Sequence, residues 1–400
     1  MTDTRGLPLH GIRIIELTHM VMGPAAGVVL GDLGADIIRI EPIGGDATRA
    51  LRGSGAGYFP MYNRNKRSLS VDLKSDAGKK IVYQLVDDAD VLIENFRPGT
   101  MERLGFGYDA LKARNPALIY CSNKGFLSGP YEHRTALDEV TQMMGGLAYM
   151  TGPPGRPLRA GTSVVDVTGG MFGALGILAA LFQRNASGQG QEVVASLFES
   201  TVFLVGQHMA QYAVMGEPAA PMPARVSAWA IYQIFDTKDD DQVFVGVVSD
   251  KQWQLFCDAF ELDQLATDPT LKTNNDRAAQ KERLVTAVQE AFRKLTKREL
   301  MERLEKTGLP FAPIGKPEEL LDDPHLNASE GLLEVSVTEG EHSGTKMRLP
   351  ALPLTMGGVR FGVHQDIARA GEHTREILKE LGYRDEEIDD LLARGIVASS

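Results

Sequence analysis

The stretch GIRIIELTHMVMGPAAGVVLGDLGADIIRIEP, residues 11–42, decides the fold class of this 400-residue chain. Its apolar run Gly11 to Leu17 predicts a strand, which Gly23–Pro24 separates from the next element. Ala25 to Leu33 then predicts a helix, and Ile37 to Ile40 predicts a second strand. A strand, a helix and another strand in this order form the unit from which parallel sheets are built.

The same alternation continues through the first half of the chain. The further expected strands and helices are Ser75 to Asp87 (helix), Val91 to Glu94 (strand), Thr100 to Asn115 (helix), Leu118 to Ser122 (strand), Val167 to Gln183 (helix), Glu192 to Ala195 (strand) and Ser200 to Met215 (helix). Strands that alternate with helices indicate a parallel sheet covered on both faces. The first half is therefore expected to be α/β and Rossmann-like.

The alternation of strands and helices stops at Pro218 to Arg225, a proline-rich stretch that is the best candidate for a linker. Beyond it, Ala230 to Phe235 and Val243 to Val248 flank a turn and predict an antiparallel hairpin. The remaining expected elements are helices at Lys251 to Phe260, Arg277 to Phe292, Lys297 to Glu305, Gly371 to Leu381 and Asp385 to Arg394, with a strand at Gly308 to Ile314. Because a single hydrophobic core stops growing at about 250–300 residues, we expect two domains.

Composition narrows the class of partner. The formal net charge is −11 and the sequence pI is near 5.3, which disfavours nucleic acid or an anionic membrane as the main partner. The longest apolar run, Met171 to Phe182, contains two glycines and predicts a buried helix rather than a membrane span. Cys121 and Cys257 lie far apart and indicate reduced thiols. With a polar N-terminus that lacks a signal pattern, this predicts a cytoplasmic protein.

Familiar catalytic motifs are missing from the sequence. No G-x-G-x-x-G follows the first strand, and there is no Walker loop, H-E-x-x-H or G-x-S-x-G motif. The eight histidines form no cluster, so no metal site is expected.

Asp166 is the carboxylate with the most informative surroundings. It lies between Val164–Val165 and an apolar helix that contains glycines. One interpretation is a helix N-cap, because aspartate is a preferred capping residue. The other is a nucleophile, because the helix dipole and N–H donors keep a carboxylate at a helix N-terminus ionised. The two interpretations are compatible.

Polar and basic residues follow several of the expected strands, where α/β proteins bind ligands. These stretches are Asn65 to Ser68, Asn95 to Gly99 and Lys124–Gly125, with Arg103 on the helix that follows Gly99. They are either solvated surface charges or a set of phosphate partners. Met20 to Met22 is either core or the lining of a pocket at the end of the first strand.

Several separated blocks, in the right order, resemble the class III CoA-transferase family, which includes formyl-CoA transferase, carnitine CoA-transferase and α-methylacyl-CoA racemase. Besides the opening stretch, the blocks are YNRNKRSLSVDLKS (62–75), VLIENFRPGTMERLGFGYDAL (91–111), GTSVVDVTGG (161–170), GQGQEVVASLFES (188–200) and GEHTREILKELGY (371–383). The resemblance covers essentially the whole chain.

The resemblance implies an architecture and a set of site residues. A large Rossmann-like domain, residues 1–220 with 325–400, would carry an inserted smaller α+β domain, residues 225–320, and two chains would form an interlocked, ring-like homodimer. Asp166 matches the transferase nucleophile. The matched CoA-binding positions are Val21, Leu73, Lys74, Asn95, Phe96, Arg97, Arg103, Lys124 and Gly125. CoA and acyl-CoA would be substrates, with no tightly bound cofactor. Separately from the resemblance, we infer from the expected helix start that the backbone amides near Thr168 to Gly170 stabilise an oxyanion.

Two departures from the family pattern bear on the reaction. Val21 replaces a glutamine of formyl-CoA transferase, whose glycine-rich loop is replaced by Arg225 to Trp229, so formate and oxalate are doubtful substrates. The racemase branch has a histidine before the aspartate that matches Asp138, whereas this chain has Leu137, with His133 at the wrong spacing. We therefore expect CoA transfer through a covalent aspartyl intermediate. A 2-methylacyl-CoA racemase and a catalytically inactive acyl-CoA-binding protein remain the alternatives.

Overall fold

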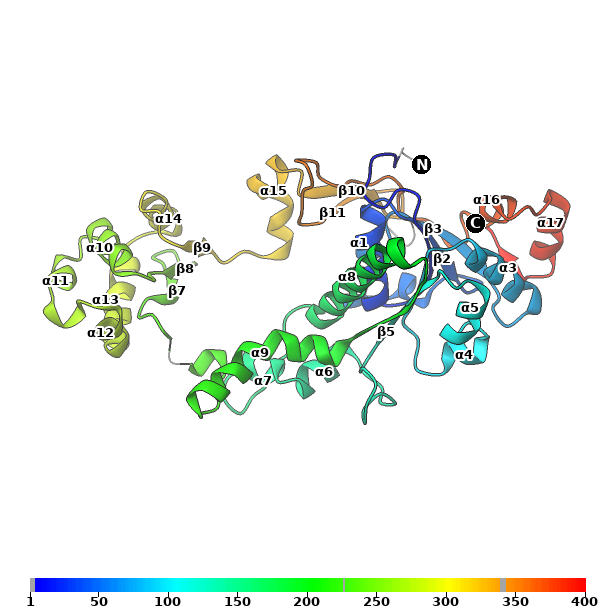
Figure 1. Ribbon diagram of the computed structural model, residues 1–400. Coiled ribbons are helices and arrows are strands. Elements are labelled where there is room, and N and C mark those ends of the chain that lie inside the picture. The colour runs from blue at the N-terminus through cyan, green and yellow to red at the C-terminus, as the bar shows by residue number, and fades with distance from the viewer. Residues whose placement is uncertain (1–3, 226, 339–342) are drawn as a thin grey trace. The chain divides into compact units, whose positions relative to one another are not determined.

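The structure is a computed structural model that describes residues 4–225, 227–338 and 343–400 (Figure 1). The chain divides into two compact units. The first consists of Met1–Pro223 and Pro324–Ser400, and the second of Ala224–Asp323.

A seven-stranded sheet forms the centre of the first unit, in the order β12-β3-β2-β1-β4-β5-β6. The strands are β1 (Arg13–Leu17), β2 (Asp36–Glu41), β3 (Lys66–Val71), β4 (Val91–Glu94), β5 (Ile119–Lys124), β6 (Glu192–Ser196) and β12 (Val397–Ala398). Strands β1 to β6 pair in parallel, and β12 pairs antiparallel with β3. This confirms the expected α/β class with a mostly parallel central sheet.

Helices bury both faces of this sheet. Alternate residues of β1 point to opposite faces, so Ile14 lies in one apolar core and Ile15 in the other. The first core includes residues of α1 (Met22–Asp32) and α8 (Val164–Ser187), and the second includes residues of α3 (Asp76–Asp87), α5 (Tyr108–Arg114), α16 (Thr374–Glu380) and α17 (Asp385–Ala393). Figure 1 shows α16 close to β3, although the two are far apart in the sequence.

The other elements of the first unit are short, except for α9. They are α2 (Tyr58–Tyr62), α4 (Thr100–Leu104), α6 (Asp138–Met144), α7 (Leu147–Thr151), α9 (Leu197–Met215), α15 (Pro324–Ala328), β10 (Leu332–Ser336) and β11 (Lys346–Pro350). Strands β10 and β11 form an antiparallel pair of their own.

Two expected elements differ from those observed, and strand β3 was not expected. The helix expected over Thr100 to Asn115 is two helices, α4 and α5, because Gly105 ends the first with a φ of 89°. Gly23–Pro24 lies inside the first turn of α1, where proline is tolerated. The stretch from Lys66 onward is itself a strand, β3, that the sequence pattern did not reveal.

The basic residues of β3 are buried in ion pairs, which corrects both interpretations of Asn65 to Ser68. The Lys66 ammonium lies 2.8 Å from Glu16, and the Arg67 guanidinium lies 2.8 Å from Asp36 and 2.6 Å from Glu380. A charge without water needs a nearby opposite charge. These side chains are therefore neither solvated nor available to a phosphate.

The second unit combines a small antiparallel sheet with helices. Strands β7 (Tyr232–Asp236), β8 (Gln242–Gly246) and β9 (Phe311–Pro313) pair in that order, and the expected hairpin is β7–β8. The helices are α10 (Asp250–Ala259), α11 (Asp263–Ala266), α12 (Asn274–Ala279), α13 (Lys281–Phe292) and α14 (Lys297–Glu305). Trp253, Phe256 and Phe292 lie in its apolar core.

Helix α8 is long and apolar enough to cross a membrane by composition, and it is the one such helix among the residues described. However, 44% of the apolar 18-residue stretch of this helix is buried inside the structure. A core helix of a soluble protein passes the same test, so this finding is weak evidence for a membrane span.

Candidate active site

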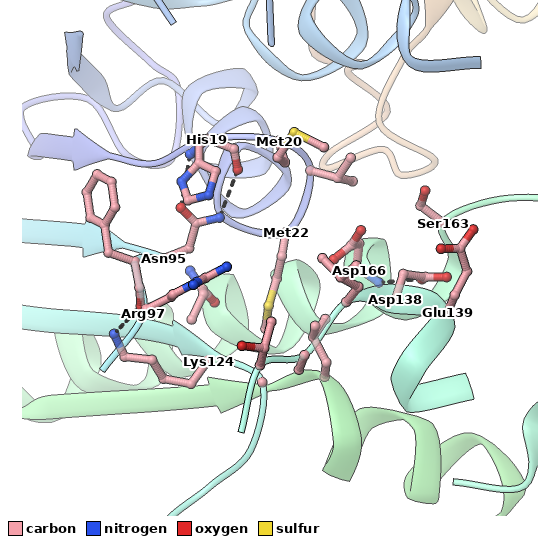
Figure 2. Close-up of a pocket in the computed structure, with 18 of the residues that line it drawn as sticks. His19, Met20, Met22, Asn95, Arg97, Lys124, Asp138, Glu139, Ser163 and Asp166 are labelled. Carbon is pink, nitrogen blue, oxygen red and sulfur yellow. Dashed lines mark hydrogen bonds between the residues drawn. The ribbon is translucent and has the colours of Figure 1, made fainter. Parts of the chain in front are cut away.

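A cavity of about 330 Å³ opens where β1, β4 and β5 end (Figure 2). The strand order places β2 on one side of β1 and β4 on the other, so the direction of winding reverses between β1 and β4. Open α/β sheets bind ligands at such a switch point, beside the carboxyl ends of the strands. The N-terminus of α8 and the segment before α6 complete the lining.

Asp166 lines the cavity from the first turn of α8. The helix begins at Val164 and Ser163 occupies the N-cap, so Asp166 is the third helical residue. The N-cap interpretation of Asp166 is therefore wrong. Its side chain belongs to the cavity rather than to the helix end.

The side chain of Asp138, rather than that of Asp166, accepts hydrogen bonds from the free amides at the start of α8. Its Oδ2 accepts hydrogen bonds from the amides of Val165 at 2.9 Å and Asp166 at 3.1 Å. Its Oδ1 accepts one from Gln142 Nε2 at 2.5 Å. Asp138 also lines the cavity, so it fixes the backbone of Asp166 and places a second carboxyl group close to the first.

The pKa of Asp166 is raised from 3.8 to about 7. Burial is the largest cause, and the negative charge of Asp138 acts in the same direction, while Arg159 opposes them. This is opposite to the expectation that the helix end keeps the carboxylate ionised, because the amides of that end donate to Asp138 instead. Asp166 consequently changes charge near neutral pH.

The amides of Thr168 to Gly170 lie beyond the first turn of α8, where a helix uses its N–H groups internally. Nearer its start, the Val164 amide donates to Thr162 O at 2.8 Å and the Val167 amide to Ser163 O at 3.0 Å. The expected oxyanion role of Thr168 to Gly170 is therefore wrong.

Asn95 fixes the segment that follows β1. Its Oδ1 accepts the His19 amide at 2.9 Å, and its Nδ2 donates to the His19 carbonyl at 2.8 Å. The His19 ring packs on Phe96 with centroids 5.4 Å apart, and burial lowers the pKa of His19, so its imidazole is neutral near pH 7. The residue Met20 has a φ of 61°, and its amide donates to Thr48 Oγ1 at 3.2 Å. A non-glycine residue in this region stores strain that its surroundings must offset.

Lys124 lines the cavity beside Asn95 and Phe96, but Glu94 neutralises it. Its ammonium lies 2.5 Å from Glu94 Oε1 and donates to the Phe96 carbonyl at 2.9 Å. Val21, Arg97 and Gly125 also line the cavity. The structure thus brings together Asp166, Val21, Asn95, Phe96, Arg97, Lys124 and Gly125 from the residues expected at the site.

Three expected residues lie outside this lining as the structure describes it. Leu73 packs against the core beneath α3 and α16, and the Lys74 amide donates to Asp72 at 2.9 Å. Arg103 is exposed and donates to Thr100 Oγ1 at 2.9 Å. Arg225, where the stretch that replaces the glycine-rich loop begins, lies over the ring of Tyr232, 6.0 Å from its centroid.

Several residues that line the cavity were not expected from the sequence, among them His19, Asn123, Arg134 and Arg159. Asn123 is the one that the pattern should have revealed, since it precedes Lys124 at the end of β5. Arg159 forms an ion pair with Glu139, another residue of the lining. Among the residues that the structure describes, no three His, Cys, Asp or Glu side chains are placed to hold a metal ion.

Comparison with known proteins shows the family of this chain. The profile of CoA-transferase family III matches residues 9–374. An acyl-CoA transferase of Fusarium pseudograminearum is 35% identical, covering 97% of this chain and 88% of the relative. A succinate–glutarate CoA-transferase of Agrobacterium fabrum is 33% identical, covering 95% and 98%.

Among solved structures, a CAIB/BAIF family protein from Brucella suis superposes with a TM-score of 0.83 at 30% identity, covering 94% of this chain and 99% of that one. The matches in sequence and in structure both extend over nearly the full chain. This protein therefore belongs to CoA-transferase family III.

Proposed function

We propose that the protein transfers CoA from an acyl-CoA to a carboxylic acid, with Asp166 as the covalent nucleophile. The observation that carries this proposal is the position of Asp166, a carboxyl group in the cavity at the switch point of the sheet in a chain of this family. A carboxylate that attacks a thioester retains the energy of the activated acyl group. No ATP, metal or other cofactor takes part in the proposed reaction.

The first half of the proposed reaction removes the donor acid. A carboxylate oxygen of Asp166 attacks the thioester carbonyl carbon, and the carbon–sulfur bond breaks with its electron pair on sulfur. This gives an aspartyl–acyl anhydride and CoA thiolate. The thiolate then attacks Cγ of Asp166, and the donor acid leaves as a carboxylate, so that an aspartyl–CoA thioester remains.

The second half repeats these steps in reverse. The acceptor carboxylate attacks Cγ of Asp166 and releases CoA thiolate, which forms a second anhydride. The thiolate then attacks the acyl carbonyl of that anhydride, giving the new acyl-CoA and free Asp166. Each bond broken is matched by one formed, and no proton is consumed overall.

Residues around Asp166 have supporting roles in this proposal. Asp138 positions the first turn of α8 through two backbone hydrogen bonds. The burial that raises the pKa of Asp166 also leaves its carboxylate poorly solvated, which makes the ionised form more reactive. An acyl anhydride must be protected from water, and the low exposure of this turn serves that purpose.

We propose that the acids are dicarboxylates such as succinate, as the name of the relative from Agrobacterium fabrum suggests for that protein. Arg134 and Arg159 line the cavity and provide cationic partners for a distal carboxylate. The pair of Arg159 with Glu139 would open to admit such an acid.

We also propose a homodimer, with the interlocked, ring-like arrangement that the family resemblance implies, an inserted small domain over residues 225–320 and a cytoplasmic location. Helices α8 and α9 support the homodimer, because large apolar side chains protrude from them. Phe182 is 82% exposed, Phe203 is 72% and Val214 is 86%. Several large apolar side chains exposed on two neighbouring helices favour a protein interface.

Intact-protein mass spectrometry tests the proposed function. The protein is mixed with a panel of acyl-CoAs and then with hydroxylamine or borohydride. We expect an adduct that maps to Asp166 and is absent from Asp166→Ala, which should still bind CoA. Turnover by Asp166→Ala, or no adduct with any acyl-CoA that binds, would refute the covalent mechanism.

Racemisation of a 2-methylacyl-CoA is the second candidate function. The observation that favours it is a histidine, His19, in the lining of the cavity. Racemisation requires two proton-transfer groups at Cα. The cavity contains a neutral imidazole, His19, as well as Asp166, whereas Leu137 occupies the position that the racemase branch gives to histidine. Deuterium wash-in at Cα of a chiral acyl-CoA would favour racemisation, and its absence during CoA exchange would exclude it.

A further inference from the structure

Asn123 belongs to the cavity lining, and the two polar atoms of its side chain are buried without a hydrogen-bond partner among the described residues. It is 2% exposed and lines the cavity from the end of β5. Neither Nδ2 nor Oδ1 has a hydrogen-bond partner among the described residues. Because a buried amide without partners costs free energy, such a group in a native protein indicates a ligand or a bound water.

Helix α8 is shaped to leave room for this side chain. A Cβ atom at Gly173 would lie 2.7 Å from Asn123 Oδ1, closer than such atoms approach in proteins. The glycine therefore allows the amide to remain between β5 and α8 in its present position. Asn123 thus lines the cavity from β5 while its amide packs against α8 at Gly173.

The position of Asn123 relative to Asp166 follows from its contact with Gly173 on α8. Gly173 follows Asp166 by seven residues on α8, which is about 10 Å along a helix axis. Figure 2 shows Asp166 and Asp138 on one side of the view and Asn95, Arg97 and Lys124 on the other. Asn123, Arg97 and Asp166 line the same cavity, which is where the proposed function places the thioester.

We propose that Asn123 binds an amide group in the pantetheine arm of CoA, with Nδ2 donating to the amide carbonyl and Oδ1 accepting its N–H. This inference rests on the proposed function. Chemistry selects the amide: a phosphate or carboxylate only accepts hydrogen bonds at neutral pH and would leave Oδ1 unpaired. An amide both donates and accepts, so it satisfies the two groups together.

The test is Asn123→Leu, which keeps the shape of the side chain and removes both polar groups. We expect the dissociation constant for CoA to rise about tenfold or more, because a site built to hydrogen-bond a polar group is left unable to do so. Adenosine 3′,5′-bisphosphate, which lacks the arm, should bind wild type and variant equally. For acyl-CoA, KM should rise while kcat stays within about twofold.

Stability separates this role from a structural one. Asn123 has no protein partner to lose among the described residues, so the melting temperature of Asn123→Leu without ligand should be unchanged or higher. The matched control is Asn115→Leu, since Asn115 Nδ2 donates to the carbonyls of Val86 and Ala89, each at 2.9 Å. That variant should melt at a lower temperature and bind CoA as wild type does.

Each other outcome identifies what fails. Equal CoA affinity in wild type and Asn123→Leu, with CoA exchange intact, overturns the inference and leaves the proposed function standing; a bound water then satisfies the amide. Equal weakening of CoA and adenosine 3′,5′-bisphosphate also overturns it. If wild type binds no CoA, the proposed function fails and the inference fails with it. Asn123→Ser provides the same measurements if the leucine variant does not fold.

Discussion

At the scale of single residues, burial and a neighbouring carboxyl group disfavour the ionised form of Asp166. Asp166 is surrounded by protein and faces Asp138, so that its pKa rises to about 7. A tenfold change in ionisation is worth about 1.4 kcal/mol. Holding Asp166 ionised therefore costs the folded protein on the order of 4 kcal/mol above neutral pH, a cost that function explains better than stability does.

The variant Asp166→Asn should be more stable than wild type at pH 8, by up to about 4 kcal/mol. Because the pKa is raised in the folded protein, this cost is absent below the unfolded pKa near 3.8 and grows as pH rises toward 7. The advantage of the variant should therefore vanish near pH 4. Urea unfolding at both pH values measures it, and an advantage independent of pH would contradict this account.

Asp138→Asn should move the pH dependence of the reaction. In wild type, kcat/KM should rise with pH and level off above about 7, as Asp166 loses its proton. Removing the negative charge of Asp138 should lower this midpoint by roughly one pH unit. A pH profile of kcat/KM provides the measurement, and a profile that only falls in height would show that Asp138 acts by position alone.

Part of this site could be predicted from the sequence. Asp166, Asn95 and Lys124 were expected because each lies near a strand end or a helix start in the pattern. The raised pKa of Asp166 was not, since it depends first on burial in the packed structure and then on Asp138, which belongs to another element. Asn123 could have been expected from its position before Lys124 at the end of β5, but its lack of hydrogen-bond partners is a property of the packed structure and leaves no mark in the sequence.

At the scale of elements, the glycines of α8 allow close contact with α1. A Cβ atom at Gly170 would lie 2.5 Å from the Met22 carbonyl oxygen, and one at Gly169 would lie 2.7 Å from Met22 Cε. The backbone oxygen cannot move aside as a side chain can. The two helices can therefore pack at this distance only with glycine at position 170.

Gly170→Ala should consequently destabilise the protein by roughly 2 kcal/mol or more, since overpacking moves α8 and with it Asp166. The matched control is Gly206→Ala on α9, where a Cβ atom meets nothing within 4 Å. Alanine there should stabilise the helix by about 0.5–1 kcal/mol. Thermal unfolding of both variants measures the contrast, and equal effects would show that α8 and α1 adjust freely.

The elements themselves were predicted unevenly, for physical reasons. Strands β1, β2, β4, β5 and β6 have apolar runs and were expected close to their observed bounds. Strand β3 reads KRSLSV, with cations that are buried only because Glu16, Asp36 and Glu380 meet them in three dimensions. A local pattern cannot reveal partners so far away in the chain.

At the scale of the whole molecule, the proposed homodimer would bury the exposed apolar side chains of α8 and α9. We expect size-exclusion chromatography with light scattering to report a dimer. Val214→Asp should shift it toward monomer, because a charge in an apolar interface is costly. Lys80→Glu, a charge change on exposed α3, should leave it unchanged. A monomeric wild type would refute the homodimer.

The broad architecture was predictable because the alternation of strands and helices is a local signal. The contribution of the C-terminal segment to the sheet was not. Residues of α16 meet β3 through the Ser70 amide, which donates to Thr374 Oγ1 at 3.2 Å, and through the ion pairs of Arg67. Strand β12 has only two residues, too few to recognise by pattern.

That C-terminal segment has a consequence for how the protein is made. The ribosome delivers β3 long before it delivers α16 and β12, and the whole second unit is synthesised between them. Until α16 and β12 are synthesised, the edge of the sheet at β3 stays open and Arg67 lacks Glu376 and Glu380. The nascent chain must therefore hold an incomplete sheet with an unpaired edge, which is where chaperones and premature termination would act most strongly.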